Sequence, residues 1–277
     1  MMMAKDMTIN EYANAIAMEI GGESRPVEKT NGVVKYGITK IDGSNISPTV
    51  YVEGWYINNV PVKEAARDIA ELIEKNRRED FDLSQFTDYE KVKGKLQARL
   101  YNKATQADVF RKATGFDGLI IIPYIDLGDI NNDGTSASVK VTNGLLQSWG
   151  VTAKEVIDTA IKNSKEDISI KSMEAIMMEL LTGETVDDED LGINPEMIVL
   201  TNRSRMYGAI TAITAKAKLK KMFPNGYVIL PSSVHEVIVV PYQPGTESEL
   251  TGMVNAVNTE EVKPEEILGN KAYIFAA

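Results

Sequence analysis

The sequence has no cysteine and only one histidine, His235, in 277 residues. The lack of cysteine excludes disulfide frameworks, thiol catalysis and thiolate zinc sites. A lone histidine also excludes metal sites built from several histidines of one chain, which leaves carboxylate sites to consider. The glycine-rich patterns GxxxxGK[ST] and GxGxxG are absent, and no kinase signature occurs, so we expect no cofactor.

Long hydrophobic runs and an excess of basic residues are also missing. No window approaches ~18 uninterrupted apolar residues, and the opening MMMAKDMTINEYANAIAMEIGG contains no run of secretory length. We therefore expect a cytoplasmic protein without a membrane association. Acidic residues outnumber basic ones by 40 to 30, a formal net charge of -10, so the field of the protein repels phosphate backbones. Direct binding to duplex nucleic acid is not expected.

The remaining composition is that of a folded protein. Hydrophobic residues make up 43% and charged residues 25% of the chain, close to ordinary globular usage. A length of 277 residues allows one large domain or two ordinary ones. We expect a single α+β body over 1–277; the alternative is two lobes, an amino-terminal helix and hairpin lobe over 1–115 and a carboxy-terminal sheet lobe over 116–277.

Several segments have helical apolar spacing. Thr8 with Glu11, and Thr152 with Glu155, have the spacing of a capping box at the start of a helix. Further amphipathic helices are predicted after Pro61, over 88–110, over 173–181 up to Gly183, and from Thr246. In the segment 88–110 the anchors are Leu96 and Leu100, one turn apart. We expect all these apolar faces to point toward the core.

Strand patterns alternate with these helices. NGVVKYGITKIDGSNISPTVYVEGWY and GLIIIPYIDLGDINNDGTSASVKVTN each predict two strands joined by a turn. The short β-branched runs MIVLTN, GYVILP, EVIVVP and AYIF predict strands of one carboxy-terminal sheet. The fold class is therefore α+β, with a mixed or antiparallel sheet and amphipathic helices packed on it.

The histidine lies in LPSSVHEVIVVP, which also places Ser232, Ser233 and Glu236 beside it. These are the residue types of a serine hydrolase, in which a base activates the nucleophile. However, Ser233 and His235 of an extended chain are roughly 7 Å apart at the backbone, and no GxSxG elbow occurs. We prefer a structural role, with His235 at the head of a strand and hydrogen-bonded to its own turn or to a neighbouring backbone carbonyl.

Two further motifs suggest ligands. Asp129, Asn131 and Asp133 of DINNDG resemble the first half of a calcium loop, but the twelfth position, which should be an acid, is Lys140. A hairpin turn therefore fits better than a metal site. Asn202, Arg203 and Arg205, which follow the run MIVL, are candidates for binding an anion at the end of a strand; solvated or paired arginines are the alternative.

Long phrases of the chain, YVILPSSVHEVIVVP, VLTNRSRMYGA, LTGMVNAVN and VKPEEILGNKAYIF, together with NGVVKYGITKIDGSNISPTVYVE, resemble the bacterial family known as domain of unknown function 5688. The resemblance implies an accessory protein of bacterial genomes and their mobile elements, and it implies no catalytic or ligand residue.

The expected function is binding of another macromolecule, most plausibly a protein, without catalysis; the sequence does not specify an oligomeric state. The alternatives are a small serine hydrolase using Ser232 or Ser233 with His235, and an acidic protein that imitates DNA to inhibit a nuclease or restriction enzyme.

Overall fold

A computed structural model describes residues 3–40, 43, 47–77, 83–104, 112–128, 137–186, 188 and 196–277. The chain divides into two compact units, Met1–Ser84 and Gln85–Ala277. The fold is α+β, and all strand pairs among the described residues are antiparallel. The predicted fold class is confirmed.

The first unit begins with the short helix η1 (Ala4–Asp6) and then α1 (Ile9–Ile20). The predicted capping box is present: Thr8 Oγ1 accepts the Glu11 N–H at 3.3 Å, and the Glu11 carboxylate accepts the Thr8 N–H at 2.8 Å. Each bond satisfies a backbone donor at the helix start. Gly21, at φ 67°, ends the helix in the left-handed conformation that glycine adopts without strain.

Strands β1 (Glu23–Glu28), β2 (Val34–Thr39) and β3 (Val50–Tyr51) follow, with η2 (Thr30–Gly32) between the first two. Strand β2 lies between the other two and pairs with both. The predicted hairpin of β2 and β3 is confirmed, although residues 41–42 and 44–46 of its turn lie outside the described residues. The sequence analysis missed β1, whose proline is tolerated because the strand lies at a sheet edge.

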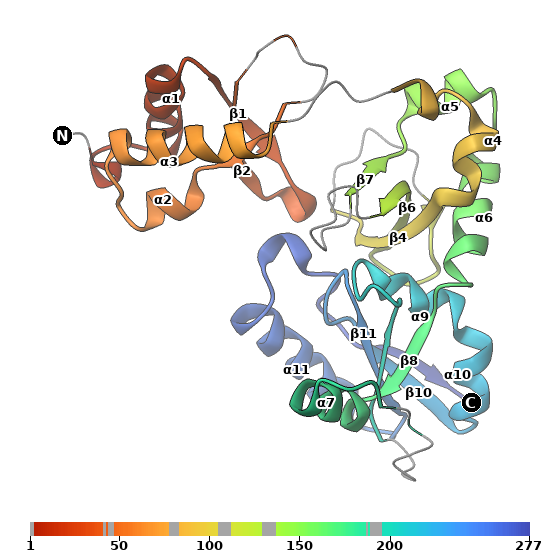
Figure 1. The fold of residues 1–277 in the computed structure, drawn as a ribbon. Helices are drawn as coiled ribbons and strands as arrows, with labels where there is room; N and C mark the ends of the chain where they lie inside the picture. The colour runs from red at the N-terminus through yellow and green to blue at the C-terminus, as the bar shows by residue number, and fades with distance from the viewer. Residues whose placement is uncertain are drawn as a thin grey trace. The chain divides into compact units, whose positions relative to one another are not determined.

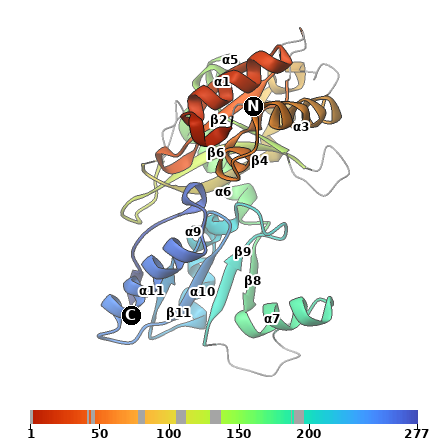
Figure 2. The same ribbon diagram turned by 90° about the vertical axis from the view of Figure 1, so that its left-hand side faces the viewer.

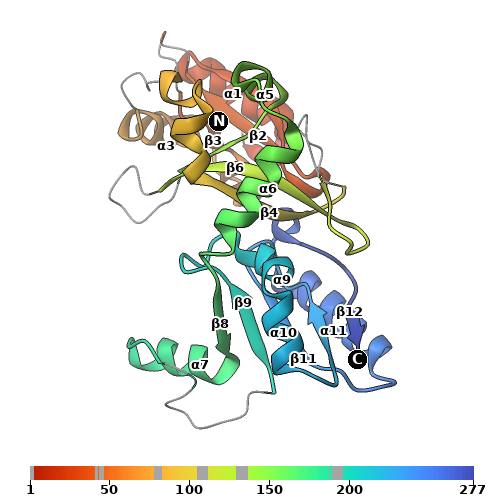
Figure 3. The ribbon, with the colours of Figure 1, turned by 90° about the vertical axis from the view of Figure 1, so that its right-hand side faces the viewer.

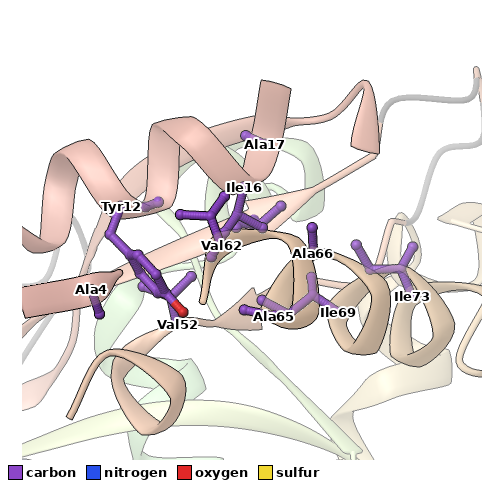
Figure 4. Close-up of a cluster of buried hydrophobic side chains, with 12 residues drawn as sticks. Ala4, Tyr12, Ile16, Ala17, Val52, Val62, Ala65, Ala66, Ile69 and Ile73 are labelled. Atoms are coloured by element: carbon purple, nitrogen blue, oxygen red, sulfur yellow. The ribbon is translucent and has the colours of Figure 1, made fainter. Parts of the chain in front are cut away.

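The core of this unit lies between α1, the sheet and α3 (Val62–Lys75), which follows α2 (Glu53–Ile57). Figure 4 shows Tyr12 and Ile16 of α1 directed toward the apolar residues of α3. The predicted face of α3 is buried and consists of Val62, Ala65, Ala66, Ile69 and Ile73. Complete burial of an isoleucine side chain contributes roughly 1.5–3 kcal/mol, so this face holds α3 in place.

The second unit starts with η3 (Leu83–Phe86), which crosses the unit boundary, then α4 (Tyr89–Val92) and η4 (Lys93–Lys95). Its first sheet contains β4 (Leu96–Asn102), β5 (Lys112–Ala113), β6 (Leu119–Gly128) and β7 (Ala137–Lys140). Strand β6 pairs with each of the other three. Strands β4 and β6 belong to the same sheet although they lie on either side of residues 115 and 116 in the chain.

The predicted helix over 88–110 is wrong for Leu96–Asn102, which is strand β4. Leu96 and Leu100 are four residues apart, a spacing that fits one helical turn and also one face of a strand. In the structure Leu96, Ala98 and Leu100 share a face of β4, and Arg99 and Tyr101 occupy the other. The predicted hairpin of β6 and β7 is confirmed as a strand pair.

Two helices follow this sheet, α5 (Asn143–Trp149) and α6 (Ala153–Ser164). Thr152 is the N-cap of α6 as predicted, since its hydroxyl accepts the Glu155 N–H at 3.3 Å. Helix α6 lies against β4 (Figure 3), where the Asn163 side-chain amide donates to the Leu96 carbonyl at 2.9 Å.

The carboxy-terminal sheet has the strand order β12-β10-β11-β9-β8. Its strands are β8 (Ser169–Ser172), β9 (Ile198–Thr201), β10 (Gly226–Leu230), β11 (Val237–Pro241) and β12 (Tyr273–Ala276). The prediction that the runs from MIVLTN to AYIF share one sheet is confirmed.

Helices cover both faces of this sheet (Figure 1). Helix α11 (Glu247–Glu260) buries Val254 against Val228 and Leu230 of β10. On the opposite face α10 (Lys216–Met222) is followed by Phe223, whose ring lies 6.3 Å from that of Tyr227. This part of the chain also contains three short helices, η5 (Gly208–Ile210), α9 (Thr211–Thr214) and η6 (Pro264–Glu266).

Helix α7 (Met173–Thr182) differs from the other long helices. Its predicted bounds are confirmed, with Gly183 as a left-handed C-cap. The expectation that its apolar face points to the core is wrong, because Met177, Leu180 and Leu181 are 56%, 75% and 81% exposed. Ala175 is its buried residue. Figure 2 shows α7 extending away from the end of β8, and its exposed apolar side chains lie beyond its first turn.

Candidate functional site

Two of the sequence-predicted candidate segments meet at one end of the carboxy-terminal sheet. Strands β9 and β10 both pair antiparallel with β11, so they run in the same direction and end at the same edge. The loop 202–207 follows β9, and the turn 231–236 follows β10. The helix η5, which follows the loop, contacts the turn directly, since Ala209 N–H donates to the Val234 carbonyl at 3.3 Å. Thr201 Oγ1 also donates to the His235 carbonyl at 2.9 Å.

The His235 ring connects these two segments. Its Nδ1 accepts the backbone N–H of Tyr207 at 3.1 Å, and the two rings are 5.0 Å apart. Because Nδ1 accepts, the proton of the neutral ring is on Nε2. That atom lies 3.9 Å from Glu266 Oε1. His235 lies just before β11, as predicted, but the partner of Nδ1 is the backbone N–H of Tyr207 and neither a group of its own turn nor a backbone carbonyl.

The serines lie in a braced turn. Ser233 is buried, and its hydroxyl accepts the backbone N–H of His235 at 3.0 Å. Its own N–H donates to the Glu236 carbonyl at 3.1 Å, which closes the turn. Ser232 lines a separate small pocket whose other walls are mainly apolar side chains of β10 and α11. A nucleophilic serine needs an imidazole nitrogen within hydrogen-bond reach, whereas His235 Nδ1 accepts from Tyr207 and Nε2 lies 3.9 Å from Glu266 Oε1.

The loop 202–207 has a strained backbone. Arg205 and Tyr207 have φ values of 56° and 58°, a conformation that costs a non-glycine residue about 1–3 kcal/mol. Asn202 compensates part of this cost, because its side chain donates to the Met206 carbonyl at 2.9 Å and accepts the Met206 N–H at 3.0 Å. Gly208 is required for close packing, since a Cβ there would lie 2.3 Å from the Asn202 nitrogen.

The two arginines predicted to bind an anion are paired with protein groups. Arg203 donates to the Glu166 carbonyl at 3.2 Å and lies 4.0 Å from the Asp167 carboxylate. Arg205 forms an ion pair with Glu179 of α7. Paired arginines were the alternative that the sequence analysis gave. The Asn202 side chain forms its hydrogen bonds within the loop, to the backbone of Met206.

Arg99 of β4 is the site residue that the sequence analysis missed. It is 7% exposed, and its guanidinium carbon lies 4.2 Å from the ring centre of Tyr124 and 3.7 Å from that of Tyr207. Stacking of this kind is favourable for a guanidinium. The sequence analysis did not consider Arg99 because it lies in the segment predicted to be a helix. In a strand, the side chains of QARLY alternate between two faces, which would have placed Arg99 and Tyr101 on the same face.

The surroundings of Arg99 are aromatic and uncharged. Tyr101 and Tyr124 are neighbours, with ring centres 6.1 Å apart. Burial raises the pKa of Tyr101 well above its ordinary value, and burial also raises the pKa of Tyr124. Both phenols are therefore neutral at physiological pH, and neither supplies a negative charge to the guanidinium.

The predicted calcium ligands Asp129, Asn131 and Asp133 lie outside the described residues. Lys140, the residue at the twelfth position of that motif, belongs to β7 and pairs in register with Tyr124. Within the described ranges, no group of three or more histidine, aspartate or glutamate residues is placed to hold a metal ion.

A second candidate surface lies on α7. We define the α7 surface as the exposed apolar side chains of Met177, Met178, Leu180 and Leu181. Near its start, α7 also borders a pocket of about 630 Å³ that reaches the start of α11. The pocket combines the apolar residues Met173, Met197 and Leu250 with the glutamates Glu174, Glu196 and Glu249.

Polar contacts hold α7 in place. The Glu179 carboxylate pairs with Lys171 and Arg205 and accepts the Val186 N–H at 3.0 Å. Hydrogen bonding from Lys171 is the main reason why the pKa of Glu179 falls to about 2. Through Arg205, the loop that contacts His235 and Arg99 is thus connected to α7.

Comparison with known proteins gives a family but no function. The model of a family described as "Family of unknown function (DUF5688)" matches residues 7–277. No curated protein and no solved structure matches the chain. Among the residues that the structure describes, no helix has the length and apolar character needed to cross a membrane.

Proposed function

The chain belongs to the DUF5688 family, and we propose that it is a non-catalytic protein that binds another protein through the α7 surface. The observation that carries this proposal is the exposure of Leu180 and Leu181, at 75% and 81%, side by side on one helix. Single exposed apolar residues are common, but a contiguous group of them is typical of an interaction site.

The chemistry of the surroundings indicates the kind of partner. Glu174, Glu196 and Glu249 border the pocket beside α7, and the whole chain has a formal net charge of -10. An apolar surface with an acidic border suits an amphipathic segment whose apolar side chains are flanked by lysine or arginine. The same charge disfavours duplex nucleic acid as the partner.

The cellular setting is part of this proposal. A sequence with no cysteine suits the reducing cytoplasm, where disulfides are rare. The resemblance noted above adds an origin in bacterial genomes or their mobile elements. We therefore propose a cytoplasmic accessory protein that acts on a bacterial or mobile-element protein.

The test compares capture of partners by three proteins from a bacterial host that carries the gene. The double variant Leu180→Glu with Leu181→Glu replaces apolar contact by charge. The control Met18→Glu makes the same type of change at a methionine of α1 that is 84% exposed. A partner retained by the parent and by Met18→Glu, but lost with the double variant, supports the proposal, and its binding should weaken with rising salt. A partner that binds all three proteins equally contradicts it.

The alternatives make different forecasts. The hydrolase hypothesis predicts that a fluorophosphonate probe labels Ser232 or Ser233 stoichiometrically and that His235→Ala abolishes labelling. That result would overturn a non-catalytic role. The DNA-mimic hypothesis predicts that replacing carboxylates by amides, and not changing Leu180 and Leu181, removes binding to the partner.

A further inference from the structure

Arg99 is a buried cation for which the described residues provide no anionic partner. Its guanidinium carbon lies 4.2 Å from the ring centre of Tyr124 and 3.7 Å from that of Tyr207. Aromatic rings at these distances stabilise the cation but supply no strong acceptor for its N–H donors. Among the described residues, no hydrogen bond or ion pair satisfies these donors.

Burial of a positive charge without an anion costs free energy, so a buried arginine is expected to have an anionic partner. The carboxylates that contact the adjoining loop and turn are engaged by other cations. Glu179 pairs with Lys171 and Arg205, and Glu266 pairs with Lys263 at 3.3 Å while facing His235. Tyr101 and Tyr124, the phenols nearest in the sheet, are neutral. Among the residues that the structure describes, the surroundings of Arg99 thus supply aromatic contacts and no negative charge.

The donors also retain some solvent-accessible surface. Among the described side chains, the polar atoms that are sealed from solvent without a hydrogen-bond partner belong to Asn31, Glu53, Thr214, Tyr227 and Asn258. The guanidinium nitrogens of Arg99 are not in this group, so the unpaired donors keep contact with solvent although the residue is 7% exposed.

We propose that Arg99 is a binding site for a carboxylate group of a ligand, which the guanidinium holds through paired N–H donors in its plane. A fork of two parallel hydrogen bonds is the geometry in which arginine binds a carboxylate. One cation matches the single charge of a carboxylate, whereas a phosphate dianion commonly requires several cations. The bracing of Tyr207 by His235 Nδ1 keeps one of the two covering rings in place.

The only histidine of the chain provides a direct readout. The His235 ring lies 5.0 Å from the ring of Tyr207, which itself covers Arg99. Its imidazole resonances are therefore unambiguous and lie next to the site. We would titrate the full chain with benzoate at constant pH and follow the imidazole signals by NMR, with the neutral amide benzamide in a parallel titration.

The expected result is a saturable shift with benzoate and none with benzamide. Arg99→Lys, which retains the charge but loses the planar fork, should weaken benzoate binding about tenfold, as expected for the loss of one charge-assisted bond. The matched control Arg203→Lys makes the same change at an exposed arginine paired with Asp167 and should bind as the parent does.

Three outcomes would overturn the assignment. They are the absence of any shift with benzoate, an equal response to benzamide, and binding that Arg99→Lys leaves unchanged. Inorganic phosphate producing the shift where benzoate does not would show that the site prefers a different anion, and it would also refute the carboxylate proposal. If Arg99→Lys does not fold, the proposal is tested on the unmodified chain by comparing the shifts that benzoate and benzamide produce. None of these results depends on the α7 surface.

Discussion

Helices α3 and α7 have similar apolar spacing but opposite surroundings. Val62, Ile69 and their neighbours in α3 are buried against α1 and the sheet of their unit. In α7 the corresponding residues, Leu180 and Leu181 among them, are exposed. The period of apolar residues thus predicts that a segment is an amphipathic helix, but it does not tell which molecule covers the apolar face.

The difference extends to the forces that hold each helix. Burial of apolar surface holds α3, a contribution that does not depend on charged groups. Charged hydrogen bonds hold α7 through Glu179, which Lys171 and Arg205 contact from β8 and from the loop 202–207. A helix fixed by a few polar contacts, with its apolar face free, is suited to presenting that face to a partner.

The largest expected effect concerns the buried helix. Ile69→Ala removes a completely buried side chain from α3 and leaves a cavity between α3 and its neighbours. We expect a loss of about 2–5 kcal/mol in the free energy of unfolding of the first unit, measured by urea denaturation. A loss below about 1 kcal/mol would mean that α3 is not held by burial, and the contrast with α7 would fail.

The next effect concerns the loop through which α7 is anchored. His235→Ala removes the acceptor of the Tyr207 N–H and leaves that donor unsatisfied beside a strained backbone. We expect a cost of about 1–3 kcal/mol in the stability of the second unit, and a smaller cost for His235→Gln if the amide oxygen reproduces the bond. Thermal melts of the three proteins provide the measurement. A melt of His235→Ala equal to that of the parent would show that the ring does not brace the loop.

Much of this architecture could be predicted from the sequence, since its signals are local. Thr8 and Thr152 cap helices as their spacing indicates, and the β-branched runs form the carboxy-terminal sheet. Leu96 and Leu100 were misleading because a separation of four residues is compatible with both helix and strand. Strand β1 was missed since an edge strand tolerates proline and charges that elsewhere mark loops.

The candidate site depended on long-range contacts that no local pattern reveals. Arg99 and Tyr207 stack although they are far apart in the chain, and the sequence instead pointed to Arg203 and Arg205. Those two arginines are paired because Asp167 and Glu179 approach them in the fold. The sequence did identify the turn that contains His235, but the partner of the ring comes from a loop that follows a different strand.

A moderate effect is expected from acid. The pKa of Glu179 is lowered to about 2, so its ion pairs stabilise α7 fully above the ordinary glutamate pKa of about 4.3 and are lost as the pH falls toward 2. Hydrogen exchange of α7 amides, referenced to α3 in the same sample, should show this loss between about pH 5 and pH 2.

The control is Glu179→Gln, which removes the charge at every pH. Its α7 should exchange faster than that of the parent at neutral pH, by an amount equivalent to about 1 kcal/mol, because solvent screens the partly exposed Arg205. The difference between α7 and α3 should then not depend on pH. Protection of α7 in the parent that is unchanged down to pH 2 would show that another contact anchors the helix.

The smallest expected effect tests directly whether the apolar face of α7, unlike that of α3, is exposed. Replacing Leu180 and Leu181 together by serine removes apolar surface that the described part of the chain does not cover, so no contact is lost in the isolated protein. We expect the free energy of unfolding to change by no more than about 0.5 kcal/mol, as is usual for exposed positions. Urea denaturation under the conditions used for Ile69→Ala provides the measurement. A loss approaching that of Ile69→Ala would mean that these leucines are covered within the folded chain, and α7 would then be an ordinary core helix.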